Sequence, residues 1–173
     1  EIVVTGVRAR ATADVLAGTA ILTGDELTRD RRPTIGETLA RQPGVSATSF
    51  GPNASRPVLR GLTGDRARLL TDGIGTIDVS NTSADHATII NPLTADRIEV
   101  LRGPSALLFS PSAIGGVVNV IDTRIPRRMP ENGYRVSGIG TYGSAADERS
   151  GGAAADVALG KQFVLHADGS YLK

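Results

Sequence analysis

The last 40 residues of the chain alternate between two kinds of side chain, and this pattern restricts the fold more than any other feature. Over residues 134–142 the even positions are apolar or small and the odd positions are mostly polar. Over residues 163–171 the odd positions are the apolar or small ones. A period of two predicts β-strands, because successive side chains of a strand point to opposite faces.

Aromatic residues stand at both ends of each apolar face, Tyr134 with Tyr142 and Phe163 with Tyr171. This spacing of eight residues spans ~26 Å at ~3.3 Å per residue, close to the ~25 Å apolar band of a membrane barrel. A half-buried sheet on a soluble core would explain one such strand, but two with the same spacing favour a barrel wall. We therefore predict that residues 133–173 are the first antiparallel strands of a transmembrane β-barrel, incomplete because closure needs about eight.

A weaker alternation over residues 152–159 predicts a third strand between these two, with residues 144–150 as its connecting turn. His166 then falls beside Asp168 on the face predicted to line the barrel lumen. We expect His166 to be a wall residue in contact with water.

Composition excludes several function classes. With 19 Lys and Arg against 18 Asp and Glu, the net charge of +1 gives no reason to expect nucleic acid as a partner. The chain has no Cys, so it has neither disulfides nor a thiolate metal site. No run of about 18 apolar residues predicts a transmembrane helix. All three Tyr follow the stretch of residues 126–130, which we take as the domain boundary.

The first 126 residues mix helix and strand signals. Capping-box patterns over residues 23–26 and 34–37 predict two short helices, the second over about residues 35–41. Asp72 and Gly73 predict a hairpin turn. Short strands are predicted over residues 45–48, 57–60, 66–71, 98–101 and 117–121. The expected product is an α+β domain: a small mixed four-stranded sheet with short helices and long loops.

Residues 97–121 combine two strand-like runs with an Arg-Gly-Pro tripeptide, a short apolar segment and a Gly-Gly pair. This order resembles the signature of the plug domain of TonB-dependent outer-membrane receptors. Residues 56–61 followed by residues 66–74 resemble the other plug motif of that family. The first residues resemble its TonB box, whose members here are Glu1, Ile2, Val3, Val4 and Thr5.

The resemblance implies a domain organisation and a function. It divides the chain into a TonB box-like segment over residues 1–6, a plug over residues 7–126 and barrel strands from residue 133. It implies active import across the outer membrane of a Gram-negative bacterium, with the plug gating the barrel lumen. The implied partners are outer-membrane lipid and the periplasmic protein TonB, energised by the inner-membrane ExbB-ExbD complex.

Two arginines occupy equivalent Leu-Arg-Gly positions, Arg60 and Arg102. In the family such arginines resemble latches that pair with carboxylates on the inner barrel wall, where a guanidinium binds in a bidentate way. A solvated arginine beside a turn glycine is the alternative. The neighbouring glycines are expected to meet backbone requirements rather than to contact ligand; they are Gly61, Gly103, Gly115 and Gly116.

The polar loop between the two plug motifs contains adjacent Asp85 and His86. It resembles the apical loop of the zinc-importing, ZnuD-like branch of the family, which makes zinc the expected transported substrate and these two residues its ligands. Imidazole and carboxylate suit Zn²⁺, but a usual site needs about four ligands. The rest would come from barrel loops. A solvated Asp-His pair explains the same residues without any metal.

Other functions stay open as alternatives. Within transport, the cargo could be a siderophore, cobalamin or another metal chelate, although the loop over residues 77–91 lacks the aromatic residues that often read such ligands. A soluble periplasmic binding or adhesion module is the second alternative. An enzyme is not expected, since Ser105, Ser110 and Ser112 lack a Gly-x-Ser-x-Gly setting and no phosphate loop with its lysine occurs. No cofactor is implied.

Overall fold

The computed structural model describes residues 3–4, 10–11, 18–51, 53–144 and 147–173. The chain forms two compact units. The first comprises residues 1–92 and 96–121, and the second comprises residues 93–95 and 122–173. None of the helices in the described ranges is long and apolar enough to cross a membrane.

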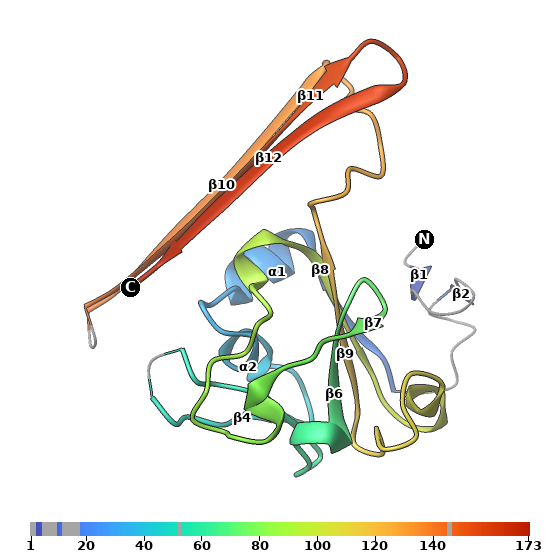
Figure 1. Cartoon of the computed structure of the whole chain (residues 1–173), viewed down its shortest axis with the longest axis vertical. Coiled ribbons are helices and arrows are strands. Elements are labelled where there is room, and N and C mark those ends of the chain that lie inside the picture. Colours follow the sequence, from blue (N-terminus) through green and yellow to red (C-terminus); the bar gives the residue numbers. More distant parts are fainter. Residues whose placement is uncertain (1–2, 5–9, 12–17, 52, 145–146) are drawn as a thin grey trace. The chain divides into compact units, whose positions relative to one another are not determined.

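A five-stranded mixed sheet forms the centre of the first unit (Figure 1). The strand order is β3-β8-β9-β6-β7. Strand β6 pairs with β9 in parallel and with β7 in antiparallel orientation, and β3 pairs with β8 in antiparallel orientation. The strands are β3 (Ala20–Thr23), β6 (Ala67–Thr71), β7 (Ile74–Gly75), β8 (Ala95–Leu101) and β9 (Gly116–Asp122).

The predicted α+β class is confirmed, with one more strand in the sheet than expected. Strand β3 was missed because its residues, Ala20–Thr23, show no alternation over so short a length. Asp72 and Gly73, both at positive φ, form the predicted turn between β6 and β7. A separate two-stranded sheet pairs β4 (Val45–Ala47) with β5 (Pro57–Leu59).

The two predicted helices form, but they are capped differently. Helix α1 (Gly24–Asp30) begins without a side-chain cap from Thr23. Helix α2 (Ile35–Leu39) is capped as predicted, since Thr34 accepts a hydrogen bond from the Glu37 amide. The Glu37 carboxylate accepts from the Thr34 hydroxyl at 2.7 Å instead of reaching a backbone amide, so the capping box is only partly formed.

Residues 97–121 fold as strand, short 3₁₀ helix and strand, and they supply much of the core. The 3₁₀ helix η5 (Pro104–Leu108) follows the Arg-Gly-Pro turn and buries Ala106. One apolar cluster joins this segment to strand β6; its buried members are Leu70, Leu101, Ala106, Ala113 and Val117.

The Gly-Gly pair is a steric requirement of this arrangement. Gly116 has φ +140°, and a Cβ there would lie 2.7 Å from the Leu101 carbonyl oxygen. A Cβ at Gly115 would lie 2.9 Å from the Arg66 carbonyl oxygen. Both glycines therefore serve backbone packing, as predicted.

A buried polar group crosses the middle of the sheet. Glu99 on β8 is fully buried, accepting from Arg97 Nε at 2.9 Å and from Asn119 Nδ2 at 3.1 Å. Asn119 on β9 accepts from the Gly73 amide at 2.8 Å. These contacts tie β8, β9 and the β6–β7 turn together, and they satisfy polar groups that would be costly to bury alone.

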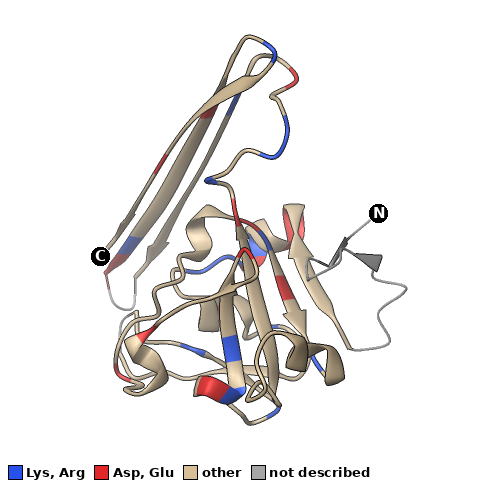
Figure 2. Ribbon diagram, turned by 45° about the vertical axis from the view of Figure 1, so that its right-hand side comes forward, with Lys and Arg blue, Asp and Glu red and all other residues tan. Residues whose placement is uncertain are grey.

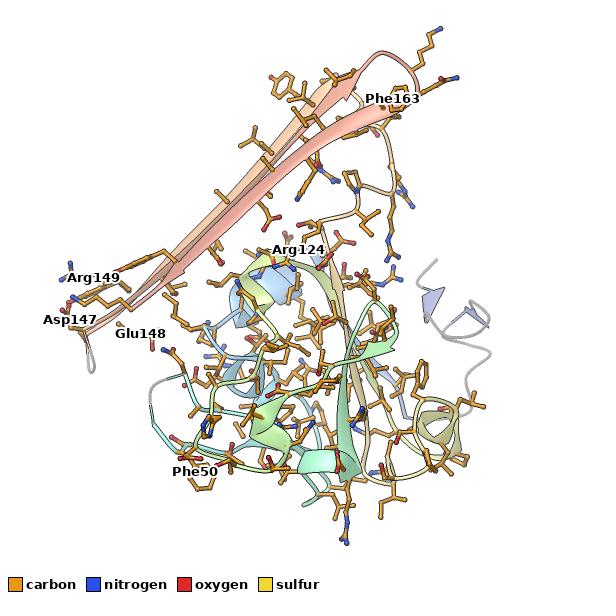
Figure 3. All side chains as sticks on the ribbon, in the orientation of Figure 1. Phe50, Arg124, Asp147, Glu148, Arg149 and Phe163 are labelled. Carbon is orange, nitrogen blue, oxygen red and sulfur yellow. The ribbon has the colours of Figure 1, made fainter. Side chains whose placement is uncertain are left out.

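The second unit is a three-stranded antiparallel sheet of long strands. It consists of β10 (Tyr134–Gly143), β11 (Glu148–Leu159) and β12 (Phe163–Leu172). Asp147, Glu148 and Arg149 lie at one end of this sheet and Phe163 lies at the other (Figure 3). The predicted third strand is thus real, and it is longer than residues 152–159.

The register of these strands confirms the two predicted faces. Tyr134 pairs with Val157, which pairs with Leu165, so the apolar positions of three strands share one face. This face is exposed in the unit, as for Val136 at 73% and Phe163 at 70%. Charged residues occupy few positions of the sheet (Figure 2). An exposed apolar face with aromatic ends is what lipid contact requires.

Replacing Gly116 with alanine tests the glycine requirement. We expect Gly116→Ala to lower the free energy of unfolding of the plug by roughly 2 kcal/mol or more, because it adds positive-φ strain and a backbone clash. Chemical denaturation of the full-length protein measures the effect. Gly18→Ala is the matched control, since no atom of the described residues lies within 4 Å of the Cβ position of Gly18. Equal stability of the two variants would contradict the assignment.

Candidate functional site

The two predicted metal ligands lie next to each other on an exposed loop tip. His86 Nδ1 lies 3.1 Å from Asp85 Oδ1, and both side chains are more than half exposed. Ser83 Oγ donates to Asp85 Oδ1 at 2.5 Å. The hydrogen bonds from Ser83 and then His86 lower the pKa of Asp85, so the carboxylate is charged at neutral pH. Within the described ranges, no group of three His, Cys, Asp or Glu side chains could hold a metal.

The base of this loop is built around the buried carboxylate of Asp78. Asp78 Oδ1 accepts from the Ser80 amide at 2.8 Å and from the Ser80 hydroxyl at 2.6 Å. Asp78 Oδ2 accepts from the Ile89 amide at 3.0 Å. One side chain therefore joins the beginning of the loop to its end.

Arg56 lies beneath the same residues and is 2% exposed. Its guanidinium donates to the Ser80 hydroxyl and, at 2.7 Å, to Asn81 Oδ1. Burial lowers the pKa of Arg56, and the negative charge of Asp78 acts against that change. The pair thus places opposite charges at the base of the loop, linked through Ser80.

Three exposed apolar side chains surround this base. Ile77 and Val79 flank Asp78 in the chain, and the amide of Ile89 contacts its carboxylate. Their exposed fractions are 97% for Ile77, 62% for Val79 and 69% for Ile89. The loop therefore offers two chemistries, a polar tip and an apolar base.

The two predicted latch arginines lie close enough to affect each other. Arg102 Nη2 donates to the Pro43 carbonyl at 2.7 Å, and its Nε is buried with no hydrogen-bond partner among the described residues. Burial, followed by the positive charge of Arg60, lowers the pKa of Arg102. Arg60 is exposed and has φ +52°. The structure thus brings together two like charges that an anion would stabilise.

The predicted TonB box is described only in part. Val3–Val4 forms strand β1, which pairs with β2 (Arg10–Ala11) in antiparallel orientation. Glu1, Ile2 and Thr5 lie outside the described residues.

A charged network crosses the second face of the three-stranded sheet. Asp156 accepts from Arg135 Nε at 2.9 Å and Nη2 at 2.6 Å, and it lies 2.5 Å from His166 Nδ1. His166 Nε2 lies 3.2 Å from Asp168 Oδ1. The His166 side chain is 11% exposed, and the carboxylates of Asp156 on the neighbouring strand and Asp168 on the same strand flank its ring. Its expected contact with water stays a prediction.

Sequence reasoning missed the contacts around Asp78 and those around Asp156. Ser80 links Arg56 to Asp78 over 22 positions, and Asp156 links Arg135 to His166 over 31. Contacts over such separations depend on the fold. One local signal was available: Asp78 stands two residues before Ser80, a spacing typical of turns in which a carboxylate accepts from the backbone.

Residues 11–117 match the family described as the TonB-dependent Receptor Plug Domain. The chain belongs to this family. The match contains the loop with Asp85 and His86, both latch positions and most of residues 97–121. Membership makes the protein an outer-membrane component of a Gram-negative bacterium, as predicted.

Curated relatives of this chain are named as transporters. The chain is 34% identical over 154 residues to the vitamin B12 transporter BtuB of Vibrio cholerae strain O395, and the match covers 87% of this chain and 24% of that protein. It is 35% identical over 115 residues to the same-named protein of Photobacterium profundum, covering 65% of this chain and 19% of that protein. The chain thus spans a quarter or less of the length of these relatives.

Solved structures share the fold. The siderophore receptor PirA from Pseudomonas aeruginosa is 28% identical with a TM-score of 0.62, covering 90% of this chain and 28% of that one. PirA from Acinetobacter baumannii is 21% identical with a TM-score of 0.66, covering 90% and 24%, and this likeness shows the fold alone. None of these relatives is named for zinc, and all are named as transporters or receptors.

The buried Asp78 carboxylate should make the plug sensitive to acid. Burial raises the pKa of Asp78, but hydrogen bonds from Ser80 and Ile89 outweigh it, and the net pKa is lowered. A lowered folded-state pKa adds stability that is complete above about pH 4 and is lost as the pH falls through the folded value. We expect Asp78→Asn to lose less unfolding free energy than the parent between about pH 5 and pH 3. Denaturation at both pH values measures this.

Gly116→Ala is the control for this experiment, because it removes no titrating group and should lower stability equally at both pH values. A pH dependence of Asp78→Asn equal to that of the parent would contradict the prediction.

The charged network of the sheet should stabilise the barrel strands. We expect Asp156→Ala to destabilise the folded barrel by roughly 1 to 3 kcal/mol, because Arg135 then loses its carboxylate partner. Asp147→Ala removes an exposed pair with Arg149 and should change little. The temperature at which the full-length protein loses its folded mobility on an SDS gel compares the two. If both substitutions lowered this temperature equally, the stabilising role of the Asp156 network would be contradicted.

Proposed function

We propose that this chain is the plug and first barrel strands of a TonB-dependent importer of the outer membrane. The main support for this proposal is the family match over residues 11–117, together with an exposed apolar face on the three-stranded sheet. In this proposal residues 7–126 form the plug that closes the lumen, and residues 133–173 begin the barrel wall. The relatives' names support transport and not catalysis.

TonB is the proposed energy-delivering partner, because the outer membrane has no nucleotide supply. Residues 1–5 would be its contact segment, bound by β-strand addition. Val3–Val4 pairs with Arg10–Ala11 within the chain. On binding, a strand of TonB would replace Arg10–Ala11 as the partner of Val3–Val4.

Arg60 and Arg102 are the proposed latch between plug and barrel wall. Two neighbouring guanidinium groups, one with a buried unpaired Nε, are stabilised by carboxylates that bind in a bidentate way. Acidic residues of the barrel wall would supply that charge. Their separation from the arginines during transport would release the plug.

Zinc is the cargo that the loop tip supports best. The contact between His86 Nδ1 and Asp85 leaves the second ring nitrogen for a metal, and a carboxylate on one imidazole nitrogen raises the basicity of the other. Asp85 acts in this arrangement either as a ligand or as the group that orients His86. Two side chains are half of a tetrahedral site, and barrel loops would complete it.

A metal chelate is the second candidate cargo. Relatives named for vitamin B12 and siderophores support it, and so do the exposed Ile77, Val79 and Ile89, which could pack against an apolar ligand face. The two cargoes depend on different side chains of one loop, so substitutions can separate them.

Removing the loop-tip pair tests the zinc proposal. We expect Asp85→Ala with His86→Ala to weaken zinc binding by the full-length receptor at least about tenfold, because each ligand contributes directly to the site. Isothermal calorimetry with Zn²⁺ measures the affinity. Thr82→Ala is the matched control, since its hydroxyl donates to the Val79 carbonyl of the same loop and contacts neither Asp85 nor His86 among the described residues.

Unchanged zinc affinity in the double variant would overturn the zinc proposal. Loss of vitamin B12 uptake in Ile77→Ser with Ile89→Ser, but not in the loop-tip variant, would establish the chelate instead.

A further inference from the structure

The loop of residues 78–89 has a rigid base and an exposed tip. At the base, one buried carboxylate accepts three hydrogen bonds, two from Ser80 and one from the Ile89 amide. At the tip, Asp85 and His86 are 68% and 55% exposed. These hydrogen bonds hold the two ends of the loop together and so reduce the number of conformations that the loop can adopt.

Arg56 anchors that base to the plug core. Its guanidinium donates to Ser80 and Asn81, which stand two and three positions after Asp78, and the negative charge of Asp78 compensates its charge. The backbone of Arg56 is itself held against helix α2, since a Cβ at Gly36 would lie 2.8 Å from the Arg56 nitrogen. The contacts therefore run from α2 through Arg56 and Ser80 to Asp78.

We infer that Arg56 and Asp78 are positioning residues that hold the 78–89 loop in one conformation and so present its tip to cargo. Neither residue needs to touch the cargo, since Arg56 is 2% and Asp78 is 8% exposed. A preformed loop binds more tightly because its ordering cost is met before the ligand arrives. The link to cargo rests on the proposed function; the ordering of the loop does not.

Loop order and cargo binding can be measured on the same full-length protein. In Asp78→Ala, hydrogen exchange of the amides over residues 79–89 should rise about tenfold, while exchange in β8 and β9 stays unchanged. The affinity for Zn²⁺ alone, by calorimetry, should fall about tenfold, the lower end of the range for supporting groups at metal sites. Arg56→Met should act in the same direction, and Arg56→Lys should restore part of the effect.

A merely structural role would give a different pattern. With such a role, Asp78→Ala would speed hydrogen exchange throughout the plug, or it would leave the exchange of the loop amides unchanged. Either result overturns the inference. Glu26→Ala is the control, because it removes an exposed carboxylate of helix α1 that accepts from Gln42, a contact that involves neither Arg56 nor any residue of the 78–89 loop. Ser80→Ala serves as a milder variant if Asp78→Ala does not fold, with the same expected direction.

A double-substitution cycle separates this inference from the zinc proposal. In the Asp85→Ala, His86→Ala background, Asp78→Ala should have no further effect on zinc affinity, since nothing remains for it to position. An additive loss of affinity there would overturn the positioning role. If zinc affinity is unchanged by removing Asp85 and His86, the zinc proposal fails, and the exchange of the loop amides alone decides the positioning role.

Discussion

The parallel pairing of β6 with β9 is the constraint on which the plug depends. It joins residues 67–71 to residues 116–120, which lie far apart in the chain. The chain enters β9 through Gly116 at φ +140°, where the Leu101 carbonyl approaches too closely for any side chain. Parallel strands need a long connection, and here it contains the β7 turn, the 78–89 loop, β8 and η5. The exposed loop is thus a consequence of the pairing.

Charge is distributed differently in the two units because one has a buried core and the other has an exposed apolar face. The plug buries Glu99 between Arg97 and Asn119, so that a polar group ties three segments together inside an apolar sheet. The three-stranded sheet gathers the charges of its middle on one face, where Asp156 joins Arg135 on β10 to His166 on β12. Its other face carries apolar side chains and glycines between aromatic ends, with Arg149 beside Tyr142 at one end. A sheet with one lipid face must gather its charges on the opposite face.

The loop that offers Asp85 and His86 combines features that a binding segment requires. Its ends are tied by Asp78 and supported by Arg56, and its tip is open to solvent. Rigid support under an exposed polar pair limits the entropy lost on binding. The apolar residues around the base, Ile77, Val79 and Ile89, add a surface of different chemistry. In the proposed function, the ion and the chelate would therefore contact two different parts of one loop.

Patterns with a short repeat were readable from the sequence alone. Alternation of side chains predicted β10, β11 and β12 and their two faces, because the period of a strand is local. The family motifs predicted the plug, its Gly115 and Gly116 and its place in the outer membrane. Adjacent Asp85 and His86 were visible as a candidate pair for the same reason.

Contacts between distant positions were decided only by the tertiary structure. Strand β3 is too short to show a period, and it forms because its backbone pairs with the edge of strand β8. In the sequence Arg56 is one more arginine of a plug motif, yet the fold buries it under the 78–89 loop, where it bonds Ser80 and Asn81. His166 was predicted to lie on the lumen face, and only the strand register shows that Asp156 lies opposite it. Local patterns determine which elements form, whereas burial and pairing depend on which elements meet.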